Sequence, residues 1–382
     1  MKKLQQAMIG QIDRWRWWTL VILLLSNPGL GQSLAPGESH RVAVVGPFSG
    51  PFAAHGERQQ AAVRWAVEQL NEEGGVAGKP LELLAFDDRC DPAMAERRAR
   101  EVLAAGVRLV VGHLCSAATL AAAPIYEAGD AVMITPGATD PALTRQGYRR
   151  VFRVLPTAEH QIPSAVGFLR ERLQPQRLAV LHDDSDYGEL VGRSAVNALQ
   201  EAGVPVVLTA RTGHSQNEFS RLVEVLAANR VDAIYYGGFA EELGLLLNQA
   251  RRQGFEVPVM GADAAASLLL VDLAGAAAEG VYLSLPAALA APPEAALQGF
   301  LEERQWTRSP LLVLASVAAL RVLAAALELV GSQPDMALTS AIRDSVHATP
   351  LGLLSFDEVG EPTGFHYGIY RWQGDQVVPV TR

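Results

Sequence analysis

Short apolar runs alternate with helix-length amphipathic segments along most of this 382-residue chain. The first apolar run covers residues 41–46, and the helical pattern after it covers residues 56–73. A run near the end, 365–372, alternates apolar and polar positions and predicts a late strand. Regular alternation of strand and helix predicts an α/β fold built on doubly wound parallel sheets. The other strand-like runs lie near residues 81–86, 107–112, 131–135, 151–154, 177–182, 204–209, 231–237, 257–260 and 280–284.

The length of the chain predicts two lobes, because a single hydrophobic core rarely grows beyond about 250–300 residues. Interruptions near residues 155–157 and 285–286 mark the candidate seams between the lobes. The longest apolar stretch, 311–330, carries Arg321 and Glu328 and is rich in alanine. We expect it to form a buried helix of a soluble protein.

The N-terminus has the three regions of a secretory signal peptide. Basic residues precede an apolar run at 17–25, and small or turn-forming residues follow it at 26–31. The run is short for a membrane-spanning helix, which needs about 20 residues. We therefore expect residues 1–31 to be a cleaved signal peptide, with an uncleaved anchor as the alternative. No cysteine follows the run, which excludes a lipid-modified anchor.

Charge narrows the range of partners. Removal of residues 1–31 takes away four of the 32 basic residues and one of the 41 acidic residues. The remaining chain has a net charge of about −12 with histidine neutral, and it keeps no stretch rich in lysine or arginine. This balance makes nucleic acid and anionic membrane surfaces poor partners.

Two cysteines, the only ones in the chain, follow two of the predicted strands. Cys90 follows the run 81–86 and Cys115 follows the run 107–112, with one helix-like stretch between them. The two strands would be parallel, so both cysteines would emerge at the carboxyl edge of the sheet, where open α/β folds bind ligands. An exported protein favours a disulfide between them. The alternative is a Cys115 thiol nucleophile with His113 as its base.

The loops at the other strand ends suggest what is bound. Ser116 and Thr139 precede helices in the first half, and helix N-termini with hydroxyls bind carboxylates. Aromatic residues and Asp263 end strands in the second half, and a carboxylate can pair with an ammonium group. These features suit an α-amino acid zwitterion held between two lobes. Ser116, Thr139 and Asp263 are equally compatible with simple N-caps.

Enzymes and metal proteins are not favoured by the remaining motifs. The acidic loop 182–186 lacks any defined metal-ligand spacing. No Gly-x-Ser-x-Gly elbow, P-loop or dinucleotide fingerprint follows the first strand, so we predict neither catalysis nor a cofactor or metal. An exported hydrolase that uses Cys115 or Ser116 is retained as an alternative.

Several ordered motifs lie along the chain, at residues 42–46 with 49–51, 87–92, 112–116, 133–136, 235–238 and 356–360. Together these motifs resemble the periplasmic leucine/isoleucine/valine-binding proteins of ABC importers. The resemblance extends from about residue 41 to 372 and implies two Rossmann-like, doubly wound lobes joined by three crossover strands. It implies one lobe of about 40–155 plus 287–364, and a second of 156–286 plus 365–382. It also implies a monomeric periplasmic protein that delivers its ligand to permease subunits.

The same resemblance implies roles for four polar positions. Ser116 would bind the ligand α-carboxylate, and Thr139 would contact both the carboxylate and the ammonium group. Gly137, where the family commonly has alanine, would offer its backbone carbonyl to the ammonium group. Asp263 would pair with the ammonium group, although the family carries glutamate there.

The side-chain pocket departs further from the family. Leu114, Cys115 and Tyr187 match the pattern. His55 stands where the family has an aromatic residue, usually tyrosine or tryptophan. Phe239 replaces a tyrosine, and Leu312 falls near another aromatic position. We expect an aliphatic, branched-chain amino acid first, with His55 admitting a larger or more polar side chain. The alternative is a sensor or uptake receptor for an amide, urea or another small nitrogen compound.

Overall fold

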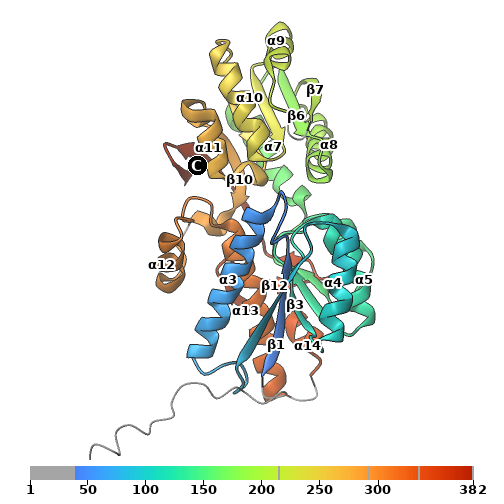
Figure 1. Ribbon diagram of the computed structural model, residues 1–382. Coiled ribbons are helices and arrows are strands. Elements are labelled where there is room, and N and C mark those ends of the chain that lie inside the picture. The colour runs from blue at the N-terminus through green and yellow to red at the C-terminus, as the bar shows by residue number, and fades with distance from the viewer. Residues whose placement is uncertain (1–38, 214–215, 291, 334–335, 381–382) are drawn as a thin grey trace, which may run out of the picture. The chain divides into compact units, whose positions relative to one another are not determined.

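The computed structural model describes residues 39–213, 216–290, 292–333 and 336–380 (Figure 1). Its first sheet has five parallel strands in the order β2-β1-β3-β4-β5. β1 thus lies between β2 and β3, the next two strands along the chain, which is the flavodoxin-like doubly wound order. The strands are β1 (His40–Gly46), β2 (Leu81–Asp87), β3 (Leu109–Val111), β4 (Val132–Thr135) and β5 (Val151–Arg153).

Helices cover both faces of this sheet because alternate strand residues point to opposite sides. Val42 and Val44 of β1 pack into a core with α3 (Ala53–Glu72) and α13 (Leu311–Ser332), and Figure 1 shows these two helices side by side. Ala43 and Val45 pack into the opposite core with α4 (Pro92–Ala104) and α5 (Ser116–Ala128). The short α6 (Ala142–Arg145) follows β4 and contributes Leu143 to that second core.

The second sheet has seven strands in the order β15-β14-β10-β9-β8-β6-β7. Five of them are parallel and repeat the order of the first sheet, whereas β14 and β15 add an antiparallel edge. The strands are β6 (Leu178–Asp183), β7 (Val206–Thr212), β8 (Ala233–Gly237), β9 (Val259–Gly261), β10 (Tyr282–Pro286), β14 (Tyr367–Gln373) and β15 (Gln376–Pro379). Its helices are α7 (Ile162–Phe168), α8 (Asp186–Glu201), α9 (Ser220–Ala228), α10 (Ala240–Arg252) and α11 (Leu268–Ala274).

The chain passes three times between the cores of the two sheets. It leaves the first sheet after β5 and returns after β10, because residues from α12, α13 and α14 share the core of the first sheet. It enters the second sheet again at β14. We call the part built on the first sheet lobe 1 and the part built on the second sheet lobe 2. The returning segment of lobe 1 holds α12 (Ala295–Glu303), α14 (Leu338–Arg343) and a small sheet of β11 (His347–Thr349), β12 (Gly352–Phe356) and β13 (Pro362–Thr363).

The fold class predicted from the sequence is confirmed, and each predicted strand has a counterpart that begins or ends within a few residues. Three features differ from the prediction. The first helix begins three residues earlier than residue 56, and the strands β11, β12, β13 and β15 were not predicted. The second sheet is mixed, whereas the sequence predicted parallel sheets.

The apolar helix α13 is a core helix in this fold. Of the described helices it alone is long and apolar enough to cross a membrane by length and composition. Most of its apolar window is buried against the first sheet, as the sequence predicted. The predicted signal peptide lies outside the described residues.

Candidate ligand-binding site

The candidate residues follow the carboxyl ends of equivalent strands in the two lobes. In lobe 1, His55 lies after β1, Ser116 after β3 and Thr139 after β4. In lobe 2, Tyr187 lies after β6, Phe239 after β8 and Asp263 after β9. β1 and β3 are neighbours in the first sheet, and β6 and β8 are neighbours in the second. From each pair of neighbours the chain continues in opposite directions across the sheet. Open α/β folds bind ligands at this switch point.

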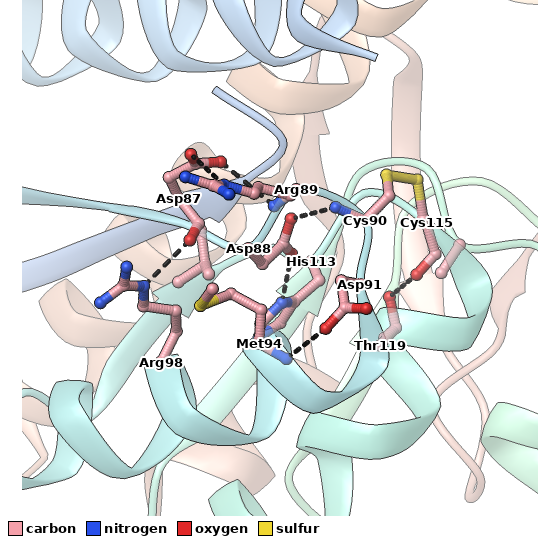
Figure 2. A network of polar contacts seen from close by, with 12 residues as sticks. Asp87, Asp88, Arg89, Cys90, Asp91, Met94, Arg98, His113, Cys115 and Thr119 are labelled. Carbon is pink, nitrogen blue, oxygen red and sulfur yellow. Dashed lines mark hydrogen bonds and ion pairs between the residues drawn. A yellow bond between two sulfur atoms is a disulfide. The ribbon is translucent and has the colours of Figure 1, made fainter. Parts of the chain in front are cut away.

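A disulfide joins the two loops that the sequence paired. Cys90 and Cys115 are bonded, with 5.4 Å between their Cα atoms and a sequence separation of 25 (Figure 2). The predicted disulfide is therefore confirmed. The chain has no other cysteine, so the alternative of a Cys115 thiol nucleophile is wrong.

A buried histidine–aspartate pair supports the turn that carries Leu114, Cys115 and Ser116. His113 Nδ1 lies 2.5 Å from Asp88 Oδ2, and both side chains are fully buried. Figure 2 shows that Asp88 also accepts a hydrogen bond from the Cys90 backbone N–H. The backbone carbonyl of His113 accepts a hydrogen bond from the Thr135 hydroxyl. The loops after β2, β3 and β4 are thus connected through buried polar groups.

Ser116 lies in the first turn of α5, where the first backbone N–H groups have no intrahelical partner. Its Oγ accepts a hydrogen bond from the Asp140 backbone N–H at 3.3 Å, so its own hydroxyl hydrogen remains available as a donor. The same contact brings the loop of Thr139 next to the start of α5. This corner of lobe 1 offers N–H and O–H donors suited to a carboxylate. Ser116 is not the N-cap of α5, because Cys115 occupies that position.

Hydrogen bonds to backbone groups hold the loop that carries Gly137 and Thr139. Thr135 Oγ1 accepts hydrogen bonds from the Gly137 and Ala138 N–H groups, and the Thr139 carbonyl accepts one from Ala158 N–H. Among the hydrogen bonds of the described residues, none uses the Thr139 hydroxyl or the Gly137 carbonyl oxygen. Thr139 does not cap α6, whose N-cap is Pro141. Both groups can therefore serve a ligand.

Asp263 presents a part-buried carboxylate in lobe 2. Its Oδ1 accepts hydrogen bonds from the Tyr187 hydroxyl at 2.5 Å and from Gln161 Nε2 at 2.8 Å. Its Oδ2 accepts a longer one, at 3.4 Å, from the Tyr367 hydroxyl. Asp263 does not cap α11, whose N-cap is Ser267.

Gln161 and Tyr367 were not predicted as site residues. Gln161 is fully buried, and its Oε1 accepts hydrogen bonds from the Asp263 backbone N–H and the Ser284 hydroxyl. These two contacts fix the amide so that its NH2 group points at the Asp263 carboxylate. In the sequence, Gln161 is marked only by its position a few residues after the first lobe seam.

Burial shifts the ionisation of this cluster. Desolvation raises the pKa of Asp263 above its usual value. The hydrogen bonds that its carboxylate accepts, chiefly from Tyr187 and Gln161, lower the pKa but do not cancel this effect. Desolvation and then the nearby Asp263 charge hold the pKa of Tyr187 well above its usual value. Tyr187 therefore stays a neutral donor. The Asp263 carboxylate has hydrogen bonds but no cationic partner among the described residues.

A model of the periplasmic binding protein family matches residues 39–375. This chain belongs to the periplasmic binding protein family. It is 36% identical to the leucine-, isoleucine-, valine-, threonine-, and alanine-binding protein of Pseudomonas aeruginosa, over 91% of this chain and 93% of that one. It is 33% identical to the Leu/Ile/Val-binding protein of Escherichia coli K12, over 90% of this chain and 94% of that one. The crystal structure of a leucine-binding protein from Thermotoga maritima superimposes with a TM-score of 0.76 at 25% identity, covering 89% and 97% of the two chains.

Membership of the periplasmic binding protein family confirms the resemblance seen in the sequence motifs. The family consists of non-catalytic solute-binding proteins, so the expectation that the chain is not an enzyme is confirmed and the hydrolase alternative is wrong. No cluster of three or more histidine, cysteine, aspartate or glutamate residues within the described ranges could hold a metal ion.

Phe239 and Tyr187 form an aromatic pair in lobe 2 of this family member. Their ring centroids lie 5.6 Å apart at a tilted angle. The backbone N–H of Phe239 donates to Asp183 Oδ2 at 2.8 Å, and Asp183 also accepts from the N–H of Ser185, the N-cap of α8. The acidic loop that superficially resembled a metal site therefore fixes the two aromatic residues.

His55 and Leu312 lie in the first turns of α3 and α13 of lobe 1. The imidazole of His55 is crowded by Phe52, whose ring centroid lies 6.4 Å away. Desolvation, followed by the positive charge of Arg58, lowers the pKa of His55 even though more than a third of its surface is exposed. His55 is therefore neutral at pH 7, which suits contact with an uncharged side chain.

Proposed function

We propose that this chain is the substrate-binding protein of an ABC importer for branched-chain amino acids. The observation that carries the proposal is the Asp263 carboxylate, which is part-buried, held by neutral donors and without a cation among the described residues. A buried carboxylate is costly unless it is paired, and a ligand ammonium group would supply the missing charge.

The opposite end of the ligand would be bound by lobe 1. The α5 N-terminus, the Ser116 hydroxyl and the Thr139 hydroxyl are donors that favour a carboxylate. The Gly137 carbonyl is an additional acceptor for the ammonium group. Donors in one lobe and a carboxylate in the other match the two charges of an α-amino acid.

The ligand side chain would contact Leu114, Cys115, His55, Tyr187 and Phe239. Most of these groups are apolar or aromatic, which favours an aliphatic side chain. The named relatives from Pseudomonas aeruginosa and Escherichia coli bind leucine, isoleucine and valine. Because 91% of this chain is matched to the Pseudomonas aeruginosa protein, we propose that its ligand is also a branched-chain amino acid.

The transport cycle would involve capture and delivery without chemical change. A ligand that contacts both lobes favours the conformation in which both sets of contacts form. Export by the predicted signal peptide would bring the protein to the periplasm, where membrane permease subunits receive the ligand. Micromolar affinity would require about 8 kcal/mol of net binding free energy.

The test is calorimetric titration of the ligand-stripped mature protein with the twenty amino acids, and with acetamide, urea and γ-aminobutyrate as controls. We expect one-to-one binding of leucine, isoleucine or valine. Binding of a compound that lacks the α-carboxylate or the ammonium group, and of no amino acid, would overturn the proposal in favour of an amide or urea receptor. Asp263→Asn, which keeps the shape of the side chain, is the matched control for the ammonium contact.

A further inference from the structure

Arg153 places a buried guanidinium beside the loop that carries Gly137 and Thr139. It is the last residue of β5, and its side chain is 0% exposed. A buried arginine is costly unless its donors are satisfied. The acid that compensates its charge is Glu361, whose Oε1 lies 3.0 Å from Arg153 Nε and whose side chain is 15% exposed.

The guanidinium donates to the carbonyls on both sides of Thr139. One terminal nitrogen donates to the Ala138 carbonyl at 3.0 Å, and the other donates to the Asp140 carbonyl at 2.8 Å. Arginine can hold two carbonyls at once because its donors form a rigid planar fork. The peptide units Ala138–Thr139 and Asp140–Pro141 are thereby fixed. Among the described residues, the Thr139 hydroxyl stays free of protein partners.

Glu361 comes from the returning segment of lobe 1, more than 200 residues after Arg153 in the chain. The Asp357 side chain accepts hydrogen bonds from the N–H groups of Val359 and Glu361, which closes this turn. The Gly360 carbonyl accepts a hydrogen bond from the Arg153 N–H at 3.2 Å. Gly360 has φ +87°, and a β-carbon there would lie 2.3 Å from the Val151 carbonyl oxygen. Only glycine allows this close approach of the turn to β5.

A third residue connects the acid to the guanidinium. The hydroxyl of the buried Thr144, in α6, donates to Glu361 Oε1 at 2.5 Å and accepts from Arg153 at 3.0 Å. The network therefore joins β5, α6 and the turn 357–361 around one loop. The motif 356–360 has a structural role here, because its Asp357 closes the turn that carries Glu361.

We propose that Arg153 and Glu361 are positioning residues that hold Gly137 and Thr139 in the geometry that binds the ligand. The inference rests on the proposed function, since it assigns to this pair the preorganisation of the same site. A loop fixed before binding loses less conformational freedom when the ligand arrives, and this raises affinity. Neither residue is among the proposed ligand contacts. The pair acts through the backbone of residues 138–140.

The test compares Arg153→Lys, Glu361→Gln and Thr144→Val with Leu323→Ala. Lysine cannot hold two carbonyls with the fork geometry, and glutamine removes the compensating charge. Thr144→Val is the milder variant, which keeps the test valid where the ionic variants fail to fold. Leu323 is buried in α13 and belongs to the core of lobe 1, so its truncation lowers stability without touching the network.

Two quantities are measured on the folded mature proteins, namely leucine affinity by calorimetry and amide hydrogen exchange at Ala138 and Asp140. We expect each network variant to weaken leucine binding at least tenfold and to speed exchange at both amides at least tenfold. Leu323→Ala should change either quantity by less than twofold, even with an equal loss of melting temperature. When the wild type binds leucine, unchanged exchange or unchanged affinity in a folded network variant would overturn the inference.

The exchange measurement separates this inference from the proposed function. A wild-type protein that binds no amino acid refutes the proposed function, and faster exchange in the ligand-free variants then still supports a positioning role for the pair. A wild-type protein that binds leucine, with network variants that bind equally well, refutes the positioning role alone.

Discussion

The Leu114 side chain fills the space that a β-carbon at position 137 would need. A β-carbon built on Gly137 lies 2.4 Å from Leu114 Cδ1 and 3.1 Å from the Leu114 carbonyl oxygen. The loops after β3 and β4 can approach this closely because Gly137 has no side chain. The glycine that departs from the family pattern is thus matched to the leucine across from it.

We predict that Gly137→Ala weakens leucine binding about tenfold or more. The added methyl group must displace the Leu114 side chain, and overpacking of this kind typically costs about 1–3 kcal/mol. A ligand with a small side chain, such as alanine, should lose less affinity. The measurement is calorimetric titration of wild type and variant with both amino acids.

The double variant Leu114→Ala/Gly137→Ala is the control for this prediction. It removes the clash with the Leu114 side chain but also the contact of that side chain with the ligand, so leucine affinity should recover only part of the loss caused by Gly137→Ala alone. An unchanged ratio of leucine to alanine affinity in the single variant would contradict the assignment of Leu114 to the ligand pocket.

The second prediction concerns the pH dependence of binding. The ammonium contact requires an ionised Asp263, so affinity is full above the pKa of this carboxyl and is lost as the pH falls through it. Because burial raises the pKa of Asp263, this loss should begin at a higher pH than for an exposed aspartate, whose pKa is about 3.9. Leucine titrations between pH 7.5 and 4.5 measure it.

Asp263→Asn separates the charge from the fold. We expect this variant to bind leucine about a hundredfold more weakly, with residual affinity that no longer changes with pH over that range. In the free protein the sign is opposite, because a raised pKa means that the folded state favours the neutral carboxyl. Acidification through that pKa should therefore raise the free energy of unfolding of the ligand-free protein. A pH-independent wild-type affinity would argue against an ionic contact at Asp263.

The third prediction tests His55 as a determinant of specificity. Replacing His55 by tyrosine adds apolar surface at the start of α3, and we expect the preference for leucine over a polar amino acid such as threonine to rise about tenfold. His366, which is also exposed, provides the matched control His366→Tyr. Competition binding of the two ligands measures the preference. Equal preference in all three proteins would remove His55 from the pocket.

The strands and the disulfide were predictable because their signals are local. Strands buried on both faces appear as continuous apolar runs, and the two cysteines follow two such runs directly. The short strands of the returning segment were missed because they carry little apolar signal, and Leu353 in β12 is largely exposed. The antiparallel direction of β14 is set by its pairing with β10 and is not encoded in its own alternation.

The support of the site depends on contacts between residues far apart in the chain. Tyr367 reaches Asp263 because β14 pairs with β10, with Tyr367 opposite Pro286. Gln161 meets Asp263 from 102 positions away. Spacing within one sequence cannot show such partners. The site residues at the strand ends were predicted from local motifs and from the family resemblance, whereas the residues that orient them emerge only from the fold.

The last prediction concerns the buried pair of Asp88 and His113. Their side chains approach to 2.5 Å, and both are 0% exposed. Removing one partner leaves the other polar group buried and poorly satisfied, which typically costs about 3–5 kcal/mol. We therefore expect Asp88→Asn and His113→Ala each to lower the free energy of unfolding by several kcal/mol, measured by urea denaturation with the disulfide intact.

The double variant Asp88→Asn/His113→Ala should lose clearly less than the two single losses combined, because the second substitution removes the group that the first left unsatisfied. Asp91→Ala is the matched control, since Asp91 is an exposed carboxylate three residues from Asp88 that caps α4 by accepting from Met94 N–H. Loss of such a cap typically costs about 1 kcal/mol. Additive losses in the double variant would mean that Asp88 and His113 stabilise the loops independently, and that the turn before Ser116 owes its geometry to other contacts.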